Sequence, residues 1–134
     1  MFYDFTLTVP ANTDYTTPIE RRMRLTKGVI HRVEVDFPVG TRALVHVQIF
    51  RGGHQIFPTN PDGDMKTDGQ VIAWDEHEEL DDEPLELVAK GWSTANTYDY
   101  DIAIRIGLLS KEVIYPFTGL FGTLRKVLAF LGGK

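Results

Sequence analysis

Polar and apolar residues alternate along most of the chain up to about residue 110. The longest run is 98–106, where the odd-numbered positions are mostly polar and the even-numbered ones form an apolar face. That face holds Tyr98, Tyr100, Ile102, Ile104 and Ile106. A period of two is typical of a strand with one buried and one wetted side. The same alternation predicts strands over residues 3–9, 29–37 and 43–49.

Short glycine-containing breaks separate these runs, at Lys27-Gly28, residues 38–41 and Arg51-Gly52-Gly53. Because such breaks are typical of tight turns, residues 19–57 are predicted to form a four-stranded meander. Further strands are predicted near 70–74, 84–90 and 98–107, with a shorter one at 111–115. About eight short strands with no helix between them predict an all-β antiparallel β-sandwich or jelly roll.

Two longer segments interrupt the alternation and are predicted to be surface loops. Residues 58–69 are rich in Pro, Asn, Asp and Gly, and seven of the nine residues from 75 to 83 are acidic. A calcium loop is partly matched by Asn60, Asp62, Asp64 and Asp68, but Met65 and Val71 stand where its glycine and bidentate glutamate belong. Solvated loops are therefore favoured in both places, with a bound cation or a basic partner surface as the alternative.

The C-terminal segment, residues 116–134, has a different period. From Thr118 onward the apolar positions recur at helical spacing and cover one side of a helix. These positions are Leu120, Phe121, Leu124, Val127, Leu128 and Leu131. Thr118 is a plausible N-cap and Gly132-Gly133 a stop, which predicts one amphipathic helix over 118–131. The chain divides accordingly into a sandwich domain, 1–115, and a helical docking or oligomerisation segment, 116–134.

The predicted helix has three candidate partners. Its apolar stripe suits a neighbouring subunit and the open side of its own sandwich equally well. Contact with a membrane surface, assisted by Arg125 and Lys126, is a weaker third alternative. A helix of about 14 residues measures about 21 Å, too short to cross a bilayer.

Composition narrows the function classes. The length of 134 residues suits one domain, and a formal net charge of -5 argues against a general nucleic-acid binder. The absence of cysteine excludes disulfides and thiolate chemistry. The N-terminus has no apolar run of signal-peptide length, so we expect a protein made in the cytoplasm and used there or built into a larger assembly.

No catalytic pattern stands out among the polar residues. The four histidines are scattered without metal-ligand spacing, and His31, on the apolar face of its strand, is expected at the edge of the core. No serine has the glycine-flanked elbow of hydrolases. Trp74, Trp92, Tyr98 and Tyr100 suit a sugar-binding face, but the alternation favours the two tyrosines as core residues. We expect a non-enzymatic protein without metal or cofactor.

Several segments together resemble small β-sandwich structural proteins of tailed-virus virions. They are residues 27–33, 37–40, 44–47 and 55–60 with the later pair Gly91-Trp92, a resemblance that covers roughly residues 5–108. It carries no catalytic motif and leaves the C-terminal segment outside. The resemblance implies a capsid-decorating or head-associated jelly-roll protein that forms a symmetric oligomer on a shell protein of the virion.

The expected function is therefore assembly of a virion, with the segment 116–134 mediating subunit or shell contacts. The alternative is a carbohydrate- or calcium-binding module that uses Trp74, Trp92 and the two loops.

Overall fold

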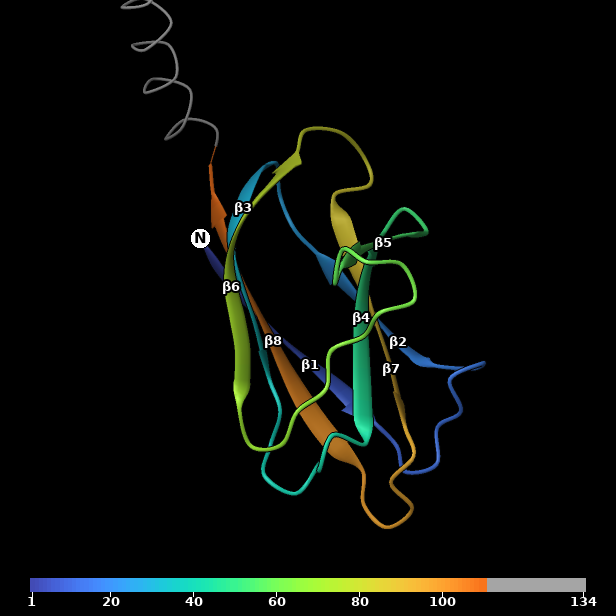
Figure 1. The fold of residues 1–134 in the computed structure, drawn as a ribbon. Coiled ribbons are helices and arrows are strands. Elements are labelled where there is room, and N and C mark those ends of the chain that lie inside the picture. Colours follow the sequence, from blue (N-terminus) through green and yellow to red (C-terminus); the bar gives the residue numbers. More distant parts are fainter. Residues whose placement is uncertain (111–134) are drawn as a thin grey trace, which may run out of the picture.

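The computed structural model describes residues 1–110, which fold into eight strands in two four-stranded antiparallel sheets (Figure 1). This confirms the predicted all-β class. The strands are β1 Phe2–Val9, β2 Ile19–Arg24, β3 Gly28–Asp36, β4 Val45–Arg51, β5 His54–Phe57, β6 Val71–Leu80, β7 Glu86–Ser93 and β8 Tyr100–Leu109. The predicted strand at 111–115 and helix at 118–131 lie outside the described residues, and so does the division near residue 115.

The strand order is β1-β8-β3-β6 in one sheet and β2-β7-β4-β5 in the other. Every connection within residues 1–110 crosses between the sheets except the one from β4 to β5, an order consistent with the predicted jelly roll. The predicted meander over 19–57 is therefore wrong. Its four strands exist, but only β4 and β5 are neighbours. The turn at Lys27-Gly28 leads into the other sheet because turn residues favour a reversal without fixing which strand pairs next.

The two ends of the sandwich differ (Figure 1). One end, called the loop end below, carries the connections 10–18, 37–44 and 94–99 and the later part of the connection 58–70. The opposite end, called the terminal end, carries the three short connections and both Met1 and the end of β8. There the Met1 ammonium donates a hydrogen bond of 2.6 Å to the carbonyl of Leu108. The fold thus places most of its long loops at the end opposite Met1 and residue 110.

The core lies between the sheets and follows the predicted alternation. Ile102, Ile104 and Ile106 on β8 are fully buried, as are the inward positions of β3 and β4. Tyr98 departs from the prediction, because β8 starts only at Tyr100 and the Tyr98 side chain is 66% exposed. The interpretation of Tyr98 as a core residue was wrong for that reason.

A β-bulge in β3 corrects the prediction for His31. The pairing register shifts between Ile30 and Arg32, so the inward and outward sides change over at His31, which is exposed. Its ring lies over Gly107 on β8, where a Cβ atom would be 2.8 Å from Nε2. His31 is thus on the outer face of the sheet and not at the core edge, because a bulge shifts the alternation that places side chains.

The prediction of a surface loop over the acidic run, residues 75–83, is wrong for most of the run. β6 extends to Leu80, so residues 75–80 form a strand and only 81–85 form a connection. β6 is an edge strand, whose side chains reach water even on the inward side, and Glu76 and Glu78 there are half-buried. Charged residues suit such a strand because they discourage pairing with another chain.

The loop predicted at 58–69 is confirmed. No helix within residues 1–110 is long and apolar enough to span a membrane.

Candidate functional site

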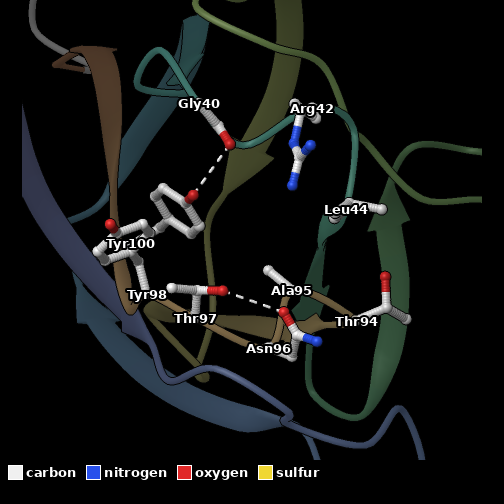
Figure 2. Close-up of a pocket in the computed structure, with 9 residues that line it drawn as sticks. All are labelled: Gly40, Arg42, Leu44, Thr94, Ala95, Asn96, Thr97, Tyr98 and Tyr100. Carbon is white, nitrogen blue, oxygen red and sulfur yellow. Dashed lines mark hydrogen bonds between the residues drawn. The ribbon is translucent and has the colours of Figure 1, made fainter.

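The candidate site is a hollow of about 440 Å³ at the loop end. Two connections, 37–44 and 94–99, form its walls together with the start of β8. Figure 2 shows that their side chains surround an open space. The residues that give it chemical character are Arg42, Asn96, Thr97, Tyr98 and Tyr100.

The wall formed by residues 37–44 is tied down by hydrogen bonds. The Tyr100 hydroxyl donates to the carbonyl of Gly40 at 2.9 Å, and the amide of Gly40 donates to Asp68 Oδ1 at 2.8 Å. Thr41 is fully buried, and its hydroxyl donates to the carbonyl of Thr67 at 2.7 Å. Bonds from β8 and from the connection 58–70 therefore hold this wall.

Arg42 is the charged residue of the hollow. It and Ala43 both adopt left-handed backbone conformations, with φ of 49° and 57°. Side chains other than glycine rarely occupy this region, and such residues are often found at binding sites. The Arg42 guanidinium points into the open space in Figure 2 and makes no hydrogen bond or ion pair with residues 1–110. The hollow therefore presents an unpaired cation.

The opposite wall supplies aromatic and polar groups. The Tyr98 ring is largely exposed, whereas Tyr100 is half-buried with its hydroxyl on Gly40. The Thr97 hydroxyl donates to Asn96 Oδ1 at 3.1 Å, which leaves the Asn96 amide nitrogen free to donate to a ligand. Figure 2 shows these side chains on the side of the space opposite Arg42.

A second cluster lies on the outer face of the sheet β2-β7-β4-β5. The rings of Trp92 and His46, on neighbouring strands, stack at 5.1 Å with an interplanar angle of 1°, and Tyr15 tilts toward Trp92 at 6.5 Å. His46 Nδ1 lies 3.0 Å from Asp64 Oδ1. Ser93 beside Trp92 is buried, and its hydroxyl accepts the amide of Ala95. This cluster fixes the connection 58–70 to the sheet.

The two tryptophans suggested for a sugar platform lie in different places. Trp74 is on β6, packs edge-on against Phe57 at 5.2 Å and donates from Nε1 to Glu76 at 3.0 Å. It closes the gap between the sheets at the β5 and β6 edges. Trp92 has one ring face covered by His46. They do not form one platform, and Tyr98 is the exposed aromatic residue of that set.

The residues considered for calcium binding are spread along the connection 58–70. Asp64 faces His46, and Asp68 accepts the amide of Gly40. Within residues 1–110 no three His, Asp or Glu side chains come together to hold a metal ion. The acidic run lies along β6, where Asp75 accepts a hydrogen bond of 3.0 Å from Arg32.

The outer face of the sheet β1-β8-β3-β6 carries a charged network. Arg105 on β8 contacts Asp36 at 2.7 Å and Glu34 at 3.3 Å, both on β3. The hydrogen bond to Asp36 raises the pKa of the Arg105 guanidinium above its ordinary value. Between β3 and β6, the hydrogen bond to Asp75 likewise raises the pKa of the Arg32 guanidinium. These charges join β8, β3 and β6 across one face and are bound to one another.

The docking residues predicted at positions 120–131 lie outside the described residues. What the structure does give is their point of departure, since residue 110 follows β8 at the terminal end. Comparison of the chain with known protein families and with curated proteins finds no match.

Proposed function

We propose that the protein is a non-enzymatic assembly component of a virion, which docks through residues 116–134 and forms a symmetric oligomer on a capsid or other shell protein. The observation that carries the proposal is the difference between the two ends of the sandwich. Residue 110, which the C-terminal segment follows, lies at the terminal end, and the connections 10–18, 37–44 and 94–99 lie at the other end. A docking segment at one end leaves the loops at the other end free to face outward.

The charge distribution supports contacts between copies. Residues 1–110 contain 18 acidic and 10 basic residues, a net charge of -8, whereas residues 111–134 contain four basic and one acidic residue, a net charge of +3. The two parts together give the -5 of the chain. Opposite charges on two surfaces favour their encounter and fix their orientation. A basic segment with an apolar stripe therefore complements the acidic sandwich of a neighbour.

The fold supports the same class of function. Its strand order is that of a double-sheet jelly roll, an architecture found in viral capsid proteins. Because a fold alone does not define a function, the proposal rests on the difference between the two ends of the sandwich and on the apolar stripe in the C-terminal segment.

The test is a pair of full-length variants compared by multi-angle light scattering. Leu124→Glu with Leu128→Glu places charges in the predicted stripe, and we expect it to reduce the oligomer to the monomer mass. Ala129→Glu, on the opposite side of the predicted helix, adds charge without interrupting the stripe and should keep the oligomer. Circular dichroism checks that both variants retain the sandwich.

An oligomer mass that the stripe variant leaves unchanged would contradict the proposal, and so would a wild-type protein that is monomeric and fails to bind shells. Recruitment to shells is measured by co-sedimentation with assembled capsids. The stripe variant should stay in the supernatant, whereas Ala129→Glu should pellet.

A further inference from the structure

We propose that the hollow at the loop end binds a carboxylated sugar, such as a uronic or sialic acid unit at the end of a glycan. In this arrangement Arg42 holds the carboxylate and Tyr98 packs against the sugar ring. This site goes beyond the assembly role and does not depend on it, because it is formed entirely by residues 40–44 and 94–100.

Charge is the first argument for an acidic ligand. Arg42 is the charged residue in the lining of the hollow, within a sandwich whose net charge is -8. The acidic groups on the surrounding segments already have partners. Asp68 accepts the amide of Gly40, and Asp99 accepts the amide of Ala11 at 2.9 Å. An anion entering the hollow therefore meets a free guanidinium, whose planar fork matches the two oxygens of a carboxylate.

Preorganisation is the second argument. The hydroxyl of Tyr100, the carboxylate of Asp68 and the buried hydroxyl of Thr41 fix the backbone on the N-terminal side of Arg42. The left-handed conformations of Arg42 and Ala43 then direct the guanidinium over the hollow (Figure 2). The backbone that carries Arg42 is therefore ordered before binding, and the ligand has to order only the Arg42 side chain.

The aromatic and polar wall distinguishes a sugar from a simple anion. The Tyr98 ring is 66% exposed and offers an apolar surface to the C–H face of a sugar ring. The free amide nitrogen of Asn96 and the hydroxyl of Thr94 supply groups that bind sugar hydroxyls. A volume of about 440 Å³ is within the range of small-ligand sites and accommodates one sugar unit.

The experiment titrates the full-length protein with four probes and follows binding by NMR. The probes are methyl glucuronide, the methyl glycoside of N-acetylneuraminic acid, neutral methyl glucoside and inorganic phosphate. We expect at least one acidic sugar to bind with a Kd of about 1 mM, at least about tenfold tighter than the glucoside and phosphate. The shifted signals should belong to residues 40–44 and 94–100.

Variants assign the binding to the two walls. Arg42→Gln and Tyr98→Ala should each weaken the acidic sugar at least about tenfold, whereas Arg24→Gln, the same loss of charge on β2 at the terminal end, should leave it unchanged. Thermal melting checks that each variant is folded.

Three outcomes would overturn the proposal. The first is that neither acidic sugar binds. The second is that phosphate binds as tightly as the sugars, which would make the hollow a simple anion site. The third is that folded Arg42→Gln binds the acidic sugar like the wild type. Since none of these results depends on oligomerisation, they leave the assembly proposal to its own test.

Discussion

At the scale of single residues, Arg51 holds the connection between β6 and β7. Its guanidinium group donates three hydrogen bonds to backbone carbonyls, those of Glu79 at 3.1 Å, Asp82 at 2.9 Å and Pro84 at 3.2 Å. The side chain is 21% exposed and also lies 3.8 Å from Glu78. A connection rich in acidic residues is thus closed by one cation at the end of β4.

Replacing Arg51 should loosen this connection. Because hydrogen bonds to a charged group contribute about 1.5–3 kcal/mol, Arg51→Ala should lower the free energy of unfolding by about 2 kcal/mol in urea denaturation. Arg51→Lys should recover only part of this loss, since an ammonium cannot reproduce the planar fork. Hydrogen exchange should rise at residues 79–86 in both variants. A fall as large in Arg24→Ala, on exposed β2, would contradict this account.

The residue scale is also where inference from the sequence is weakest. Tyr98 continues the alternation of the isoleucines, yet it precedes the strand and is exposed. His31 also fits its apolar face, but a bulge that no sequence pattern announces turns it outward. No sequence pattern singled out Arg42 as a site residue. The hollow that it lines is completed by residues 94–100, more than fifty positions away in the chain.

At the scale of elements, ion pairs tie the strands β8, β3 and β6 together across the outer face of their sheet. Arg105 reaches Glu34 and Asp36, and Arg32 reaches Glu34 and Asp75. Glu34 is therefore shared by both arginines. Shared, partly buried charges of this kind couple more strongly than isolated surface pairs.

Removing Arg105 should weaken this sheet. Arg105→Met keeps the aliphatic packing and leaves Glu34 and Asp36 next to each other without their shared cation, so we expect a loss of about 1 kcal/mol of unfolding free energy at low salt. Asp36→Asn in the same chain should reduce the loss, because it removes one of the two like charges. Calorimetry in about 1 M salt should show a smaller effect, since salt screens exposed charges. A loss independent of salt and of Asp36 would indicate packing alone.

Elements were predicted better than their pairing. Alternation located the strands β1, β3, β4 and β8, because successive side chains on a half-buried strand point alternately to the core and to solvent. It missed the length of β6, whose exposed edge tolerates charge on both sides. Pairing was not predictable from turns. The connection 25–27 crosses to the other sheet and the connection 52–53 joins neighbours, yet both are short and adjoin glycine.

At the scale of the whole molecule, the acidic sandwich and the basic C-terminal segment give the protein an uneven charge. If this complementarity helps copies associate, the oligomer should weaken as salt rises from about 0.05 M to about 0.5 M, because that change shortens the Debye length from above 10 Å to a few ångströms. Analytical ultracentrifugation at several concentrations measures the effect. Association that is as strong or stronger in high salt would show that the apolar stripe acts without help from charge.

The placement of Met1 and residue 110 at the end opposite the loops has a practical consequence for engineering. The connection 10–18 lies at the loop end, and its residues Asp14–Thr17 are exposed. A short foreign peptide inserted between Thr16 and Thr17 would be displayed at the end of the sandwich opposite residue 110. A reporter fused ahead of Met1 would instead crowd the point where the C-terminal segment departs, so epitope display belongs in the loop and labels belong away from the N-terminus.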